Sequence, residues 1–318
     1  MTIFYIFAKK YKTMKKTFII ILAVACLFSC EKIEDVEVKV NNKDLQYTLL
    51  LYYDKNKDGI LSEVEALDVT VISVVNTEYP LDGLGNFPNL EKLYVQSGLF
   101  TTLDVSKNIK LKRLDCSTTK LTTLDLSNNH ALESLVCYMS NLTSLNLSNN
   151  PNLIELRCEH NKLTSLDLNS CHNLEILTCS DNLLTEINIS NSSKLYGLSC
   201  SKNKLTSIDI SKNTKLKDFD CFSNYQLTSI DLSHNIELEK FSCDSDISIT
   251  NIDFSNNPYL KSLSCQSCIN LITLDVSNNL DLEYLYCHGN PNLDTLYMKT
   301  GQTLQRLSKD NHTTIVYL

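Results

Sequence analysis

Glycine, proline and tryptophan are scarce in this chain: its 318 residues include 7 Gly, 5 Pro and no Trp. It contains no glycine-rich loop of the kind that cradles phosphates. It also lacks a Ser/His/Asp grouping, and no paired carboxylates suggest an acid–base site. The sequence therefore predicts a protein that is not an enzyme.

Positive charge is also in short supply, because 29 Lys and Arg oppose 37 Asp and Glu, which gives a formal charge of −8. All five charged residues before Cys30 are lysines, so removal of that segment leaves about −13. An acidic surface repels phosphate backbones, which argues against nucleic acid as a partner. Beyond the N-terminal segment, no stretch is long and apolar enough to cross a bilayer.

The N-terminus is typical of an export signal. MKKTFIIILAVACLFSC, from Met14 to Cys30, joins a basic start to a short apolar stretch. Its last four residues, LFSC, resemble a bacterial lipobox, in which the cysteine receives lipid, and the acidic run that follows is similar to the surface-export tags of Bacteroidetes lipoproteins. We expect residues 1–30 to be a lipoprotein signal, with Cys30 as the membrane anchor of a protein exported to the outer membrane or cell surface. An ordinary signal peptide is the alternative, and Met14 is a second possible start.

An internal repeat organises the rest of the chain. One pattern recurs, L-x-x-L-x-C-x-x-N-x-L-T-x-L-D-L-S-x-N, and self-similarity at a fixed period indicates a repeat architecture. Its cysteines are first 21 and then 22 residues apart: Cys116, Cys137, Cys158, Cys179, Cys200, Cys221, Cys243, Cys265 and Cys287. Such periodicity marks a structural position.

This pattern resembles the leucine-rich repeat, and in particular the internalin-type bacterial subclass that forms a cysteine ladder. The resemblance covers residues 69–307 and implies a repeat solenoid, a right-handed superhelix with a parallel β-sheet on its concave face. The residues agree, because Leu-x-Cys alternates inward and outward, so each copy lays one short strand beside the last. The return segments are too short for a helix with two turns, so we expect them to be extended or turn-rich.

Stacked coils place identical residues ~4.8 Å apart, so each consensus position becomes a column. The nine cysteines then form a buried column of free thiols, and Cys171 and Cys268 replace asparagines in two neighbouring columns. Disulfides are the main alternative in an exported protein, although parallel side chains keep neighbouring Cβ atoms further apart than a bridge prefers. A zinc or Cys–His catalytic site at Cys158 and His160 is disfavoured, because Cys158 points inward and His160 faces solvent.

A calcium-loop motif precedes the repeats. DKNKDGILSEVE, at residues 54–65, matches the EF-hand loop at each diagnostic position. The expected Ca²⁺ ligands are Asp54, Asn56, Asp58, the carbonyl of Ile60, Ser62 and Glu65. Since no second loop is present and a strand begins soon after, we expect a short exiting helix and a weakly bound structural ion that fixes the N-terminal cap against the first coil. An acidic, solvated turn is the alternative.

The predicted organisation has five parts. Residues 1–30 form the signal, 31–42 a linker, 43–68 a helical EF-hand-like cap, 69–307 the solenoid, and 308–318 a closing strand.

The residues that flank each cysteine face outward from the strands, as does the residue two places after it. Exposed aromatic and Arg side chains on a rigid concave sheet are types that anchor protein or sugar ligands. The largest are Tyr94, Tyr138, Arg157, Phe222, Tyr284, Tyr286 and His288. Isolated exposed aromatics without a role are the alternative. A column of Asp and Asn on the return segments could bind cations, but local hydrogen bonds at each turn are favoured.

Two functional classes follow. The first is a monomeric surface module that recognises a protein or a glycan through the concave face, and the resemblance to internalin-type proteins implies adhesion. The second is a passive structural lipoprotein of the cell envelope that is stabilised by calcium.

Overall fold

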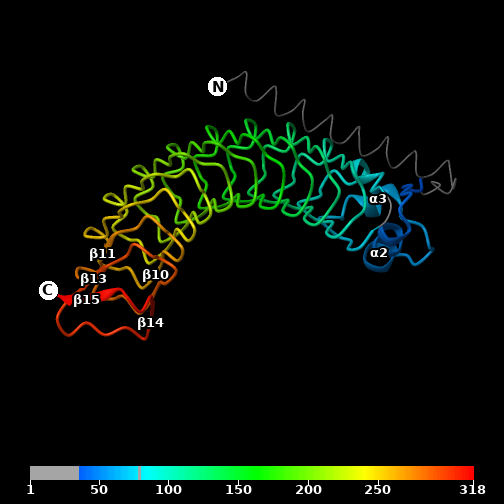
Figure 1. Cartoon of the computed structure of the whole chain (residues 1–318). Coiled ribbons are helices and arrows are strands. Elements are labelled where there is room, and N and C mark those ends of the chain that lie inside the picture. Colours follow the sequence, from blue (N-terminus) through cyan, green and yellow to red (C-terminus); the bar gives the residue numbers. More distant parts are fainter. Residues whose placement is uncertain (1–35, 78–79) are drawn as a thin grey trace, which may run out of the picture. The chain divides into compact units, whose positions relative to one another are not determined.

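The structure, a computed structural model of the whole chain, describes residues 36–77 and 80–318. The signal segment and Cys30 lie outside the described residues. Residues 38–318 form one compact unit, a curved stack of parallel coils (Figure 1). In the described part of the chain, no helix is both long and apolar enough to cross a membrane.

A twelve-stranded parallel sheet runs through the stack, with one short strand from each coil. Consecutive strands pair in one constant register, so that Leu156 lies beside Leu177 and Leu177 beside Leu198. The predicted leucine-rich-repeat solenoid, with its sheet on the concave face, is confirmed. The strands in sheet order are β1 (Val71–Ser73), β2 (Lys92–Tyr94), β3 (Arg113–Asp115), β4 (Ser134–Val136), β5 (Glu155–Arg157), β6 (Ile176–Thr178), β7 (Gly197–Ser199), β8 (Asp218–Asp220), β9 (Lys240–Ser242), β10 (Ser262–Ser264), β12 (Tyr284–Cys287) and β14 (Arg306–Lys309).

The return segments are mostly turns and irregular extended chain. Within the described residues, a second sheet forms on them near the C-terminus alone, from β11 (Thr273–Asp275), β13 (Thr295–Met298) and β15 (Thr314–Tyr317). In Figure 1 these strands lie on the outer side of the curve, whereas β10 and β14 lie on the inner side. One short 3-10 helix, η1 (Leu84–Asn86), leads into the early coils.

The N-terminal cap is helical. Helix α2 (Lys43–Tyr53) begins after Asn42, whose side chain accepts a hydrogen bond from Leu45 N–H at 3.0 Å. Helix α3 (Glu63–Ala66) is a single turn that starts with a capping box between Ser62 and Glu65. The exiting helix is therefore as short as the sequence predicts.

The core is a set of columns. All eleven cysteines of the described chain are free and buried, as the repeat predicts. Burial raises the pKa of the ladder thiols, as at Cys158 and Cys179, which keeps them neutral. Free thiols in such a setting behave as small apolar side chains.

Asparagine columns join the coils at the end of each strand. Asn182 Nδ2 donates to the carbonyls of Cys158 and Cys179, both at 3.0 Å, while its Oδ1 accepts from Leu163 N–H at 3.0 Å. In the second column, on the return side, Asn150 Nδ2 donates to the carbonyl of Asn129 in the preceding coil at 3.0 Å, while its Oδ1 is buried without a hydrogen bond. Both columns thus tie each coil to the one before it.

Candidate functional site

The concave face is built from the outward residues of each strand and the residue after each ladder cysteine. The structure distributes the predicted ligand-binding residues widely over this face. Tyr94 is on β2, Arg157 is on β5, and Tyr138 and Phe222 follow Cys137 and Cys221. Only Tyr284, Tyr286 and His288 come from one strand, β12, and the residue that follows it.

The β12 cluster is tied to the next coil. Tyr284 Oη donates to Gln305 Oε1 at 2.7 Å, and the Arg306 guanidinium lies 5.6 Å from the centre of the Tyr286 ring. His288 Nδ1 is 2.9 Å from Ser308 Oγ. These contacts hold the aromatic side chains in place at the C-terminal end of the face.

Arg157 belongs to a polar network across β3, β4 and β5. Glu155 accepts hydrogen bonds from Arg157 Nε at 2.6 Å and from Ser134 Oγ at 2.8 Å, and Arg113 lies 3.8 Å away. Burial raises the pKa of Glu155, but the bonds from Arg157 and Ser134 outweigh it, and the net pKa lies below its usual value. Arg157 is therefore committed to a partner within the sheet.

A hollow of about 390 Å³ opens on the concave face between β6 and β10. Short side chains leave this space: the lining is Ile176, Thr178, Gly197, Leu198, Ser199, Asp218, Phe219, Asp220, Lys240, Phe241, Ser242, Ser262 and Ser264. Sequence reasoning missed this feature, because it selected large side chains as anchors. The signal it could have used is the run of Gly, Ser and Asp at the outward positions of four consecutive strands, β7 to β10, which Lys240 alone interrupts.

Predicted residues stand on the strands that flank the hollow. Arg157 lies beside Thr178 in the β5–β6 register, and Tyr286 lies beside Ser264 in the β10–β12 register. The bulky side chains named from the sequence thus border a trough of small ones.

The floor of the hollow is rigid and apolar. Phe219 and Phe241 replace the usual strand leucine on β8 and β9, and their ring centres are 5.5 Å apart. The ring centre of Phe254 is 5.7 Å from that of Phe241. At Gly197, an added Cβ would meet only Ile176 Cγ1, at 4.0 Å. The missing side chain of Gly197 therefore leaves open space rather than relieving a clash.

Asp220 is the most unusual polar group in the hollow. Its Oδ1 is buried without a hydrogen bond, and Ser199 Oγ donates to its Oδ2 over a long distance of 3.5 Å. Burial raises the pKa of Asp220, nearby serines partly offset this, and the Asp244 carboxylate raises it further. The neighbouring acids are better matched, since Asp218 lies 3.2 Å from Lys240 Nζ and Asp244 accepts from Ser264 Oγ at 2.6 Å.

The predicted calcium loop is folded as a tight turn between α2 and α3. Its backbone enters the left-handed region at Lys57 (φ 59°) and Gly59 (φ 83°). Gly59 N–H donates to Asp54 Oδ2 at 3.0 Å, while Lys55 N–H donates to Glu65 Oε1 at 2.7 Å. Glu65 closes the loop onto its own start.

The oxygen atoms of the loop are of the type that binds a cation. Asp54 Oδ1 is buried without a hydrogen bond, and the pKa of Glu65 lies below its usual value because the Ser62 backbone N–H donates to it. Asp54 Oδ1 is therefore available as an oxygen donor, while both Glu65 oxygens accept hydrogen bonds from Lys55 and Ser62. Carboxylate oxygens are of the hard type that Ca²⁺ prefers. Within residues 36–77 and 80–318, no three His, Cys, Asp or Glu side chains are gathered as a metal cluster, so the fit is one of donor type and order.

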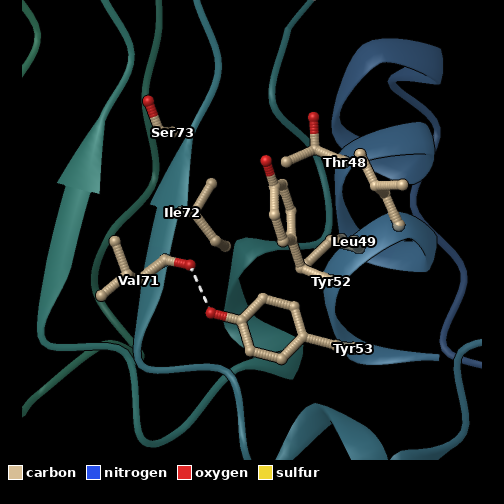
Figure 2. A pocket seen from close by; sticks show the side chains of 8 residues that line it. Thr48, Leu49, Tyr52, Tyr53, Val71, Ile72 and Ser73 are labelled. Atoms are coloured by element: carbon tan, nitrogen blue, oxygen red, sulfur yellow. Dashed lines mark hydrogen bonds between the residues drawn. The ribbon is translucent and has the colours of Figure 1, made fainter. Parts of the chain in front are cut away.

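A second hollow, of about 630 Å³, lies between α2 and the edge strand β1 (Figure 2). Tyr53 Oη donates to the carbonyl of Val71 at 2.9 Å and so ties the end of α2 to β1. Tyr53 directly precedes Asp54, the first donor of the loop. The loop and the first strand of the sheet are thus mechanically connected.

The acidic column on the return side is engaged locally. Asp104 Oδ1 accepts from Ser106 N–H at 2.9 Å, and Asp209 Oδ1 accepts from Ser211 N–H at 2.9 Å. Hydrogen bonds from these serines lower the pKa of both carboxyls. The favoured prediction for this column, local hydrogen bonding, is confirmed.

Solved structures share this architecture. Internalin InlF of Listeria monocytogenes has a TM-score of 0.62 and 18% identity, over 89% of this chain and 98% of that one. The functional domain of InlJ from the same species, which includes a cysteine ladder, has a TM-score of 0.50 and 24% identity over 83% and 77%. The leucine-rich-repeat ectodomain of the plant membrane receptor kinase GASSHO1/SCHENGEN3 from Arabidopsis thaliana, in complex with CASPARIAN STRIP INTEGRITY FACTOR 2, has a TM-score of 0.50 and 21% identity over 71% and 32%.

These likenesses show the leucine-rich-repeat fold. The sequence matches no protein-family model, and no curated protein matches it.

Proposed function

We propose that the protein is a non-enzymatic, monomeric recognition module that binds a protein ligand on its concave face. The hollow over β6–β10 is the observation that carries this proposal. A rigid sheet with a preformed concavity, an apolar floor and a few polar groups is the usual form of a binding site. Exposed aromatic side chains on β12 extend the same surface toward the C-terminus.

The structural neighbours support a binding role. The plant ectodomain was solved with a bound partner, and it shares the curved array of strands. A protein ligand is favoured over a glycan, because the hollow presents an incompletely satisfied carboxylate above an apolar floor. Such a surface suits the mixed apolar and charged anchors of protein interfaces.

Two further properties belong to the proposal. The lipobox-like LFSC motif supports export with a lipid anchor at Cys30, on the outer membrane or cell surface. The donor set of the 54–65 loop supports Ca²⁺ held by Asp54, Asn56, Asp58, the Ile60 carbonyl, Ser62 and Glu65. Bound there, the ion supplies a positive charge that fixes α2 and α3 relative to β1.

The test uses the whole chain, purified in detergent, against a displayed random-peptide library and a glycan array. Peptides are expected to be enriched, and the double variant Phe222→Ala with Tyr286→Ala is expected to weaken their binding roughly tenfold or more. Tyr259→Ala removes an exposed tyrosine on a turn outside the main sheet and should leave binding unchanged.

Enrichment of neither peptides nor glycans would instead favour the passive envelope protein. Binding to glycans alone would refute the protein ligand, and equal effects of the double variant and Tyr259→Ala would refute the concave face as the binding surface.

A further inference from the structure

We propose that the hollow over β6–β10 is a socket for one cationic side chain, an arginine or a lysine, of the protein ligand. The inference rests on the proposed function and names the chemistry of its central contact. Space, charge and the apolar lining support it independently.

The available space matches a single long side chain. A hollow of about 390 Å³ is at the lower end of the range of ligand pockets and is sufficient for an extended side chain and its backbone. Gly197 and the outward serines of β7, β9 and β10 keep it open. A Cβ added at Gly197 would have one neighbour within 4 Å, Ile176 Cγ1, so a larger side chain could enter the hollow from this position without a backbone clash.

The charge in the hollow calls for a cation. Among the lining residues, Lys240 is the one cation, and it lies 3.2 Å from Asp218. Lys202 Nζ, from the coil of β7, lies 5.8 Å from the centre of the Phe222 ring on the following coil. Asp220 therefore lines the hollow without a charged partner, with its Oδ1 buried and unbonded and its Oδ2 held by the long contact from Ser199. A guanidinium or ammonium group in the hollow would pair with this carboxylate through charge-assisted hydrogen bonds.

The lining also suits the stem of a cationic side chain. Arg and Lys place their methylene groups on apolar surface while the charged end finds a polar partner. Ile176, Leu198 and the paired rings of Phe219 and Phe241 provide that surface around the Asp220 carboxylate. A neutral apolar anchor would leave Asp220 desolvated and unpaired, and an acidic anchor would be repelled.

The test begins with peptides selected on the whole chain from the displayed random library. The enriched peptides are expected to share an Arg or Lys, and its replacement by citrulline or norleucine should weaken binding roughly tenfold to a hundredfold. Gly197→Leu, which fills the hollow, and Asp220→Asn, which removes the charge but keeps the shape, should each produce a similar loss.

Asp209→Asn is the matched control, because Asp209 lies on the return segment and asparagine already occupies this column at Asn146 and Asn188. Thermal melting checks that each variant is folded. As a second readout on the unaltered chain, ¹³C NMR of the Asp220 carboxyl should show its raised pKa falling when the cationic peptide is added.

Peptides that bind the concave face but lack a cation would overturn the socket while leaving the proposed function standing. The same conclusion follows if Gly197→Leu and Asp220→Asn leave the affinity for these peptides unchanged, or if the pKa of Asp220 is the same with and without peptide. Peptides that are insensitive to the Phe222 and Tyr286 changes as well would overturn the proposed function, and the socket with it.

Discussion

Cysteine in this chain is a packing residue. Each ladder thiol stands where a strand ends, beside the small side chain, most often asparagine, that occupies the turn, and the space suits a side chain that is small and apolar. A thiolate there would be desolvated, which is why burial raises the pKa throughout the column. Exposure to an oxidising compartment therefore need not produce disulfides.

Burial should also make the ladder thiols unreactive. In the chain without its signal, none of the nine ladder cysteines should react with a thiol-specific chromogenic reagent under native conditions, even at about pH 9. Unfolding in denaturant without a reductant should release all eleven. A smaller number after unfolding would show disulfides and contradict the free-thiol column.

Asp246 breaks the asparagine column. It is buried in a slot where other coils place Asn, and its Oδ1 accepts from Asn224 N–H at 2.5 Å. Burial raises its pKa to about 8, and Cys268 and Asp244 add to that shift. The folded protein therefore holds this carboxyl protonated at pH values where the unfolded chain has released the proton.

The linkage predicts a change of stability with pH. The contribution of protonated Asp246 is fully present below the unfolded pKa of about 4, and it is lost as pH rises toward about 8, by at most ~1.4 kcal/mol per pH unit. Asp246→Asn should remove this slope and raise the free energy of unfolding at pH 8 by a few kcal/mol.

Denaturant unfolding between pH 5 and 8 measures the effect. Asp209→Asn is the control, because its depressed pKa places its own stability change below this window. A variant Asp246→Asn that keeps the wild-type slope would show that another group titrates.

At the scale of elements, the two ends of the sheet need protection, because an open strand edge invites pairing with other chains. At the N-terminal end, α2 lies beside β1 and is tied to it by Tyr53. At the C-terminal end, Lys309 takes the cysteine slot of β14, and its Nζ donates to the carbonyl of Thr313 at 2.8 Å. A charged edge residue and a helical cap are both recognised means of blocking edges.

Calcium is expected to stabilise the N-terminal cap. Millimolar Ca²⁺ should raise the melting temperature of the whole chain by a few degrees, since tenfold excess over Kd adds about 1.4 kcal/mol. Glu65→Gln should abolish that rise while Gln still completes the capping box with Ser62.

Differential scanning calorimetry with calcium and with a chelator provides the measurement. Glu63→Gln, an exposed acid outside the donor set, should respond to calcium as the wild type does. A wild-type melting temperature that is indifferent to calcium would contradict the ion's structural role.

At the scale of the whole molecule, the solenoid is nearly one-dimensional, because each coil packs and hydrogen-bonds mainly with its neighbours. The 22-residue copies begin after Asn224, and the strands remain in register across the change, as Asp218 pairs with Lys240. The added residue is absorbed in the return path, and the columns continue.

Removal of one complete copy should therefore be tolerated. Deletion of residues 117–137 joins Cys116 to Tyr138 in the repeat phase, and we expect a folded chain with a lower melting temperature and a retained β6–β10 hollow. Deletion of residues 117–136 removes one residue fewer and shifts the inward and outward positions, so we expect aggregation or loss of the cooperative transition.

Circular dichroism melting and size-exclusion chromatography compare the two deletions. Equal behaviour would show that register does not govern stability in this array.

The sequence by itself determined the columns, because a period of 21 or 22 residues forces each coil to repeat the one before it. Cys158, Asn182 and Asp209 could be assigned their roles from phase alone, and the structure places them so. The calcium ligands could likewise be named from spacing, since they lie within twelve consecutive residues, although the ion remains a prediction.

Only the tertiary structure decided where the concave face is hollow. The hollow depends on what side chains from five different strands leave vacant, and on how Phe219 and Phe241 fill the floor beneath Asp220. A repeat pattern predicts which residues face outward, but it does not predict how deep the surface is between them. That depth arises from lateral packing between coils, which no single copy of the repeat encodes.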